Sequence, residues 1–124
     1  MNRLAVLAAV ATLAVATPVL AHPKVVSATP ATGAAVASPR SIELRMSETL
    51  MPRLSGASMV MTGMPGMPGH APMKMTATTT IGADGKTIRL TPAKKLPAGN
   101  YRIDWHAVAG DTHRVTGTHE FAVK

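Results

Sequence analysis

The sequence contains no cysteine, and this absence excludes two kinds of structure. No disulfide can stabilise the fold, and no thiolate can bind a metal ion. Any sulfur ligand must therefore be the thioether of a methionine, of which the chain has nine. The stability of the fold must come from the packing of its secondary structure.

Aromatic and acidic residues are also scarce. Tyr101, Trp105 and Phe121 are the only large aromatic residues, and six acidic residues face 13 basic ones, for a net charge of +7. An excess of basic residues is typical of proteins that bind phosphate groups. Here, however, the basic residues are scattered, with Lys94 and Lys95 the only adjacent pair. Because aromatics for base stacking are lacking too, we expect no nucleic-acid partner.

Long hydrophobic runs are absent except at the start of the chain. Arg3 precedes an apolar run over residues 4–15, and residues 19–21 are the short side chains that a signal peptidase reads. We interpret residues 1–21 as a secretory signal that is cleaved after Ala21, with an uncleaved helix as the alternative. The run is too short to span a membrane comfortably, so we expect no transmembrane segment.

No segment after the signal shows the apolar spacing of a helix. Residues 42–47, 87–91, 101–107 and 115–123 alternate apolar and polar side chains instead, and residues 82–85 and 96–100 carry turn residues between them. Residues 22–124 are therefore predicted to be a single all-β domain, a sandwich or Greek-key barrel of about seven strands.

Residues 59–75 form a methionine-rich stretch that proline and glycine interrupt. Neutral thioethers select Cu(I), and they need no deprotonation, which suits an oxidising compartment. We predict a loop whose ends, residues 58–61 and 74–81, run into strands. It lies outside the core and binds Cu(I) through some of these candidate ligands: Met61, Met64, Met67, His70 and Met73. The alternatives are methionines that fill a core or form an adaptable protein-binding surface.

A second set of donors combines the predicted mature N-terminus with a distant motif. Cleavage after Ala21 would give His22 a free α-amine beside its imidazole, and Pro23 has no amide proton to lose. Asp111 and His113 are two residues apart, so an extended backbone projects both to one side. Two imidazoles, an amine and a carboxylate suit tetragonal Cu(II).

These features together resemble the CopC/PcoC family of periplasmic copper-resistance proteins. The resemblance rests on the start at His22, the Met46-Ser47-Glu48 strand end, the methionine-rich stretch, Trp105 and the Asp111-Thr112-His113 motif. It covers essentially the whole mature chain. It implies a cupredoxin-like (Ig-like) Greek-key fold in the periplasm that carries or buffers copper and has separate Cu(II) and Cu(I) sites.

The resemblance also implies roles for single residues. His22, Asp111 and His113 become Cu(II) ligands, and Glu48 becomes an acid near the amine that does not itself bind the ion. The implied partner is a CopD-type inner-membrane copper importer or another periplasmic copper protein, and copper could bridge two molecules. Met75 receives no role, and we expect His106 and His119 to be surface or hydrogen-bonded histidines.

Two other functions compete with a non-catalytic copper carrier. An N-terminal histidine with a second imidazole also resembles the histidine brace of copper-dependent polysaccharide monooxygenases. However, a carboxylate such as Asp111 favours Cu(II), and the chain lacks a flat aromatic face for a glycan. A β-sandwich interaction module that binds no metal, with methionines as its contact surface, is the third possibility.

Overall fold

The computed structural model describes residues 12–14, 22–67 and 71–124. Residues 22–67 and 71–124 contribute the strands of two packed β-sheets. Most of the predicted signal and His70 lie outside the described residues. One sheet has the order β1 (Val25–Thr29), β3 (Ile42–Met46), β7 (Thr87–Pro92), β6 (Ala77–Ile81). The other has the order β2 (Ala35–Val36), β9 (Arg114–Val123), β8 (Gly99–Val108), β4 (Gly56–Gly63), β5 (Met73–Met75).

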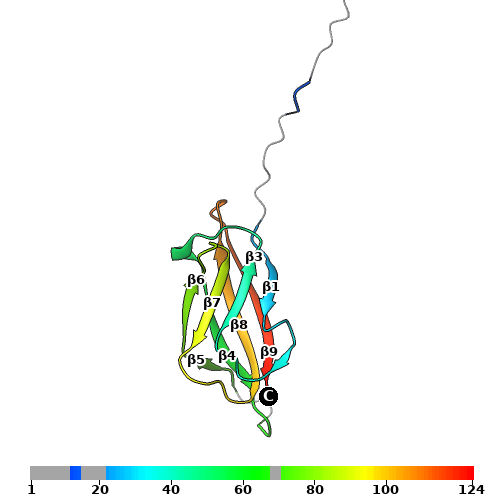
Figure 1. Ribbon diagram of the computed structural model, residues 1–124, viewed down its shortest axis with the longest axis vertical. Coiled ribbons are helices and arrows are strands. Elements are labelled where there is room, and N and C mark those ends of the chain that lie inside the picture. Colours follow the sequence, from blue (N-terminus) through cyan, green and yellow to red (C-terminus); the bar gives the residue numbers. More distant parts are fainter. Residues whose placement is uncertain (1–11, 15–21, 68–70) are drawn as a thin grey trace, which may run out of the picture.

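The predicted all-β class is confirmed, and the architecture is a sandwich rather than a closed barrel (Figure 1). The described residues contain nine strands instead of about seven. The additional strands include β2 and β5, which have two and three residues. The only helix in the described part of the chain is a 3-10 turn, η1 (Pro52–Leu54).

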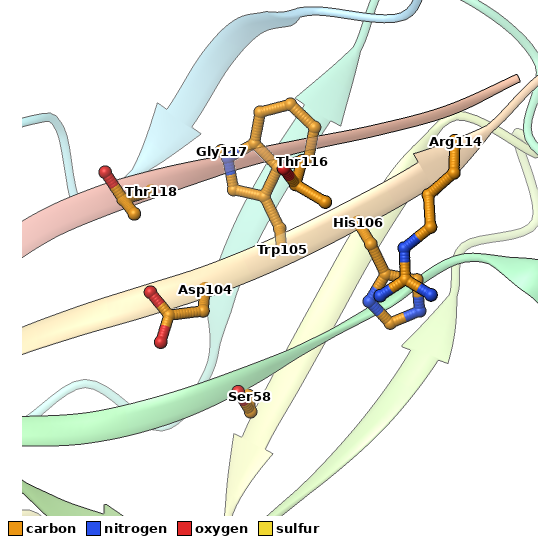
Figure 2. A pocket seen from close by; sticks show the side chains of 8 residues that line it. All are labelled: Ser58, Asp104, Trp105, His106, Arg114, Thr116, Gly117 and Thr118. Atoms are coloured by element: carbon orange, nitrogen blue, oxygen red, sulfur yellow. The ribbon is translucent and has the colours of Figure 1, made fainter.

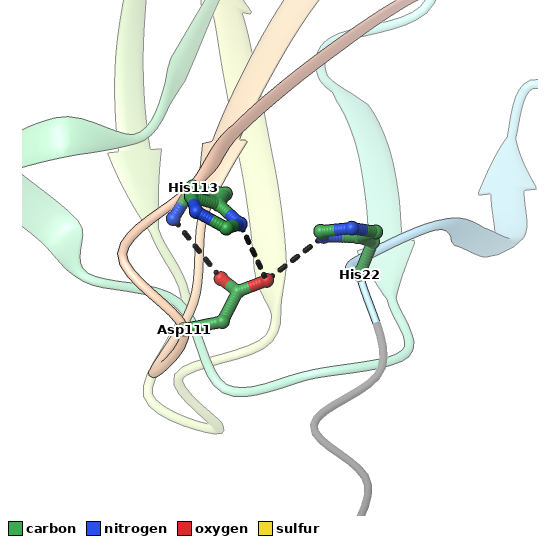
Figure 3. Close-up of side chains that lie close together, drawn as sticks. All are labelled: His22, Asp111 and His113. Carbon is green, nitrogen blue, oxygen red and sulfur yellow. Dashed lines mark hydrogen bonds and ion pairs between the residues drawn. The ribbon is translucent and has the colours of Figure 1, made fainter.

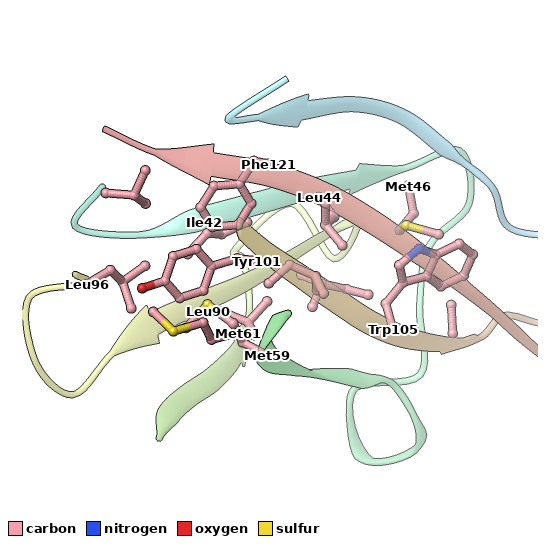
Figure 4. Close-up of a cluster of buried hydrophobic side chains, with 14 of the residues drawn as sticks. Ile42, Leu44, Met46, Met59, Met61, Leu90, Leu96, Tyr101, Trp105 and Phe121 are labelled. Carbon is pink, nitrogen blue, oxygen red and sulfur yellow. The ribbon is translucent and has the colours of Figure 1, made fainter. Parts of the chain in front are cut away.

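The core lies between the sheets and follows the alternation of the sequence (Figure 4). In β8, Tyr101, Ile103 and Trp105 are buried, whereas the polar residues between them are half-exposed. Gly117 lies opposite Trp105 on β9, and the indole occupies the space that a side chain at Gly117 would need. A strand of alternating residues can bury one face in this way because successive side chains point to opposite sides.

The methionine-rich stretch begins and ends in strands, as predicted, but the prediction that its methionines lie outside the core is wrong. Strand β4 continues to Gly63, and Met59 and Met61 on it are 0% and 2% exposed. Nothing in residues 59–62 breaks a strand, because the first glycine is Gly63 and the first proline is Pro65. Met61 is therefore a core residue by position, and β5 pairs with β4 on the far side of the loop.

The pairing of β4, β8 and β9 defines two ends of the sandwich. One end carries the loop between β8 and β9, and the other carries the loop between β4 and β5, as Figure 1 shows. Strand β8 has ten residues, so it spans roughly 30 Å at about 3.3 Å per residue. The predicted Cu(II) ligands and the methionines predicted to bind Cu(I) therefore lie at opposite ends of the molecule.

Candidate metal centre

Residues 109–113 form a tight turn between β8 and β9 that presents Asp111 and His113 together. The Thr112 amide donates a hydrogen bond to the Ala109 carbonyl (3.0 Å), and Thr112 has a left-handed backbone with φ of 61°. The His113 amide donates to Asp111 Oδ1 (3.2 Å). This local bond fixes the carboxylate against the backbone, as aspartates often do in turns.

The segment that carries His22 is held beside this turn by the end of β3. The Ser47 amide donates to the Lys24 carbonyl (2.8 Å), and the Lys24 amide donates to Ser47 Oγ (3.1 Å). Pro23, between His22 and Lys24, is fully buried. Ser47 was not predicted to take part in the site, but this pair of hydrogen bonds anchors the strand that follows His22.

His22, Asp111 and His113 converge although about ninety residues separate the first from the others (Figure 3). Their candidate ligand atoms all lie within 4.8 Å of one another. Asp111 Oδ2 is 2.8 Å from His22 Nδ1 and 3.9 Å from His113 Nδ1. The imidazoles are exposed, whereas the carboxylate is only 11% exposed, so a cation between them would be open to solvent on one side.

The carboxylate shows that these residues fit a cation. Asp111 Oδ2 is buried and makes no hydrogen bond within the described residues, and its nearest polar neighbour is His22 Nδ1, at the distance of an ion pair. A buried carboxylate oxygen without a hydrogen bond is costly, and a metal ion held between it and the imidazoles would satisfy it. Imidazole nitrogen and carboxylate oxygen are donors that Cu(II) accepts.

Glu48 is not among the residues that converge in this cluster. It is half-buried in the loop after β3, next to Ser47, which places it close to the His22 segment in the chain's path. Within the described residues it makes no hydrogen bond or ion pair with His22, Asp111 or His113. Its role beside the amine therefore stays a prediction.

At the other end of the sandwich, the methionines line a hairpin. The Met67 amide donates to the Met64 carbonyl (3.1 Å), and Gly66 has φ of +76°, as expected for a turn with Pro65 and Gly66 at its centre. Met64 and Met67 are paired across this turn. Directly opposed residues project to the same face, so the two thioethers are neighbours.

The remaining methionines differ in exposure. Met73 is 53% exposed and lies opposite the buried Met61, while Met67 is 55% exposed. Met64 and Met75 are partly buried against the core. The packing gives Met75 a structural role, and Met67 and Met73 are the more accessible thioethers. Met64 is partly buried but pairs with Met67 across the turn, and His70 lies outside the described residues.

Two other histidines have separate surroundings. His119 is buried, and its Nε2 donates to the Pro30 carbonyl (2.8 Å) while its Nδ1 lies 3.3 Å from Thr32 Oγ1. His106 lies in a hollow of about 340 Å³ on the outer face of β8, beside Arg114 (Figure 2). Burial, with a smaller contribution from the Arg114 charge, lowers the pKa of His106.

None of the helices in the described ranges is long and apolar enough to cross a membrane.

Comparison with known proteins gives a consistent result. A family model described as the CopC domain matches residues 25–124. The chain is 53% identical to copper resistance protein C of Pseudomonas syringae pv. tomato, over 84% of this chain and 82% of that protein. It is 46% identical to copper resistance protein C of Escherichia coli, over 90% of this chain and 89% of that protein.

The fold is also similar to a solved structure. The crystal structure of PcoC, a methionine-rich copper resistance protein from Escherichia coli, superposes with a TM-score of 0.78 at 46% sequence identity. The match covers 84% of this chain and all of that one. The similarity therefore extends over both ends of the sandwich.

Proposed function

This chain belongs to the CopC family, and on that premise we propose that it is a periplasmic copper-binding protein that carries or buffers copper. Copper is the cargo, and the protein performs no chemistry on it beyond binding and release. Cu(II) binds at the end that holds His22, Asp111 and His113. Cu(I) binds at the methionine-rich hairpin on the opposite end.

The convergence of His22, Asp111 and His113 is the observation that carries this proposal. Asp111 supplies a nearly buried carboxylate, and the two imidazoles supply nitrogen donors on its open side. When the signal is removed, the α-amine of His22 adds a third nitrogen next to the same ion. A site of three nitrogens and one oxygen favours the tetragonal geometry of Cu(II).

The methionine-rich hairpin supplies thioether ligands for Cu(I). Met64 and Met67 project to one face, and Met73 is exposed on the neighbouring strand. With His70, these side chains offer three thioethers and one imidazole, a combination suited to Cu(I). Met61 is a less accessible candidate because its side chain packs in the core.

The separation of the two proposed copper sites allows a different partner protein at each end. Since the two ends are separated by the length of β8, one molecule can present one oxidation state at each end to different proteins. We propose a CopD-type inner-membrane importer or another periplasmic copper protein as the recipient. A monomer is sufficient for both sites, and copper shared between the ends of two molecules would give a dimer.

Titration of the processed protein with Cu(II), followed by electron paramagnetic resonance, tests the first site. We expect one Cu(II) per molecule and nitrogen hyperfine coupling that weakens in His113→Ala. Asp111→Asn, which keeps the shape but removes the charge, should lower the affinity by at least about 10-fold. His106→Ala is the matched control, because it removes an imidazole outside the cluster.

Each part of the proposal would be contradicted by a different result. Cu(II) binding that is insensitive to both Asp111→Asn and His113→Ala would refute the assignment of this site. Copper-dependent glycan oxidation well above that of free copper would instead favour a histidine-brace enzyme. Failure of Met64→Leu, Met67→Leu and Met73→Leu together to weaken Cu(I) binding would refute the second site alone.

A further inference from the structure

The end of the sandwich that carries the methionine hairpin is ringed by basic side chains. Arg40 lies in the loop between β2 and β3, Lys74 lies in β5, and Lys94 and Lys95 lie in the loop between β7 and β8. The strand register brings these segments to the same end, since β3 begins opposite the end of β7 and β8 begins opposite the end of β4 (Figure 1). All four side chains belong to exposed residues.

These four cations are not neutralised by the protein. Within the described part of the chain, none of them forms an ion pair, whereas Arg89 pairs with Glu43 and Arg102 with Asp104 on the sheet faces. None of the six acidic residues falls in the segments that form this end, residues 37–41, 64–67, 71–75 and 93–98. The side-chain charges in these segments are therefore all positive.

Two hollows share the Lys94 and Lys95 loop. One, of about 460 Å³, lies between this loop and the segment containing Ser38 and Arg40. The other, of about 300 Å³, lies between the loop and the Lys74-Met75-Thr76 segment. Each hollow is open to solvent and bordered by cations, so each has space for an anionic group.

Exposed apolar side chains lie at the same end. Met67 and Met73 are more than half exposed, and Pro65 and Pro72 beside them are exposed too. Thioethers and prolines gain little from contact with water, and burial in an apolar environment is favourable. Cations around exposed apolar groups form the pattern of a surface that lies at a membrane interface.

We propose that this end of the protein docks on the surface of a membrane that contains anionic phospholipids. The cations come from three separate segments around the end, which matches a flat anionic surface better than a single acidic site on a protein. The phosphate head groups would lie against the Lys94 and Lys95 loop, and Met67 and Met73 would enter the head-group layer. This inference rests on the proposed export, because export brings the chain to such a surface.

Docking in this orientation has a consequence for copper. The methionine hairpin would face the membrane, while His22, Asp111 and His113 at the opposite end would remain in the aqueous compartment. A recipient embedded in the membrane would then meet the Cu(I) end first. The protein would concentrate its soft cargo at the membrane without a segment that spans it.

Co-sedimentation of the metal-free, processed protein with vesicles tests the proposal. The vesicles mix phosphatidylethanolamine with phosphatidylglycerol, and neutral phosphatidylcholine vesicles serve as the reference. We expect binding to the anionic vesicles that weakens as salt is added, because salt screens surface charges. The double variant Lys94→Gln, Lys95→Gln should lower the partition coefficient roughly thirtyfold, at about fivefold for each basic side chain near an anionic surface.

The matched control is Arg53→Gln with Lys86→Gln, which removes the same charge from the opposite end of the sandwich. It should leave partitioning within about twofold of the parent, because its charges lie beyond a Debye length from the docked surface. Equal losses in both double variants, or equal binding to neutral vesicles, would overturn the proposal. Binding to poly-L-glutamate without binding to anionic vesicles would also overturn it, in favour of an acidic protein partner.

Cu(I) titration of the same variants separates this inference from the proposed function. The Lys94→Gln, Lys95→Gln variant should keep its Cu(I) site, because no proposed ligand is altered. Loss of vesicle binding with retained Cu(I) binding supports membrane docking. Absence of vesicle binding in a parent protein that binds both copper ions would refute docking and leave the copper proposal intact.

Discussion

His119 has a structural role, although a histidine side chain can also bind a metal ion. Its Nε2 holds the Pro30 carbonyl and its Nδ1 faces Thr32, so both nitrogens are engaged inside the protein. The side chain is only 4% exposed. It therefore ties the segment after β1 to β9, and it has no nitrogen free for a metal ion.

Replacement of this residue should lower stability without affecting copper. We expect His119→Ala to reduce the free energy of unfolding by about 1–3 kcal/mol, because the Pro30 carbonyl loses its donor in a buried site. Urea denaturation of the metal-free protein measures the change. A loss of Cu(II) affinity in a fully folded His119→Ala protein would contradict this assignment.

His106 should make stability depend on pH. Burial and the Arg114 charge lower its pKa in the folded protein, so the unfolded chain binds the proton more readily. Its contribution to stability is then fully present above the ordinary histidine pKa of about 6.5, and it is lost as the pH falls through that value toward the folded pKa. The His106→Gln variant should therefore lose less stability than the parent between about pH 7 and pH 5.

Denaturation of the metal-free parent and variant across this range provides the measurement. The difference between them isolates the effect of His106, because all other residues are the same in both proteins. If the two curves keep a constant separation across the range, the lowered pKa of His106 is refuted.

The burial of Met61 could not be predicted from its residue type. Its residue type and its neighbours favour a copper ligand as much as a core residue, although residues 58–61 were expected to run into a strand. The structure resolves its position because β4 continues to Gly63. The type of a side chain is known from the sequence, but whether that side chain is exposed to solvent depends on where the strand ends.

The β4–β5 hairpin is the element that organises the soft ligands. Pro65 and Gly66 form the turn that places Met64 and Met67 on one face, and the left-handed φ of Gly66 is essential to it. Proline and glycine in succession made the turn predictable. A strand was expected over residues 74–81, but its division into β5 and β6, which belong to different sheets, was not predictable because it depends on pairing with β4 and β7.

Gly66→Ala should weaken Cu(I) binding by distorting this turn. An alanine at a φ of +76° is strained by roughly 1 kcal/mol, which opens the turn and separates the two thioethers. Gly33→Ala is the matched control, since Gly33 has a φ of +74° and equally open surroundings. Both variants should lose similar stability, measured by thermal unfolding, but only Gly66→Ala should lose Cu(I) affinity in a competition titration.

An equal loss of Cu(I) affinity in both variants would show that general destabilisation, and not the turn, controls the soft site.

The molecule as a whole separates two kinds of donor along its length. The nitrogen and oxygen ligands meet at one end because the β8–β9 turn and the β3 end hold Asp111, His113 and His22 together. The sequence predicted this set only through the hypothesis that cleavage makes His22 a terminus. The separation of roughly 30 Å between the ends could not be predicted, since it depends on strand register.

The same register explains why the charge asymmetry was not visible in the sequence. Arg40, Lys74 and the Lys94-Lys95 pair are far apart along the chain and look like scattered basic residues. Pairing of β2 with β9, β3 with β7 and β4 with β5 gathers them around one end. A single-sign surface of this kind appears only when the loops of different strands are placed together.

The N-terminal amine of His22 provides the most direct test of the two-site account. We would compare the processed protein, which begins at His22, with the same protein carrying an acetyl group on the His22 amine, and measure Cu(II) and Cu(I) affinities for both. The account predicts that acetylation removes one nitrogen from the paramagnetic resonance signal and weakens Cu(II) binding, while Cu(I) binding at the hairpin is unchanged. Equal Cu(II) affinity and identical spectra with and without the acetyl group would contradict it.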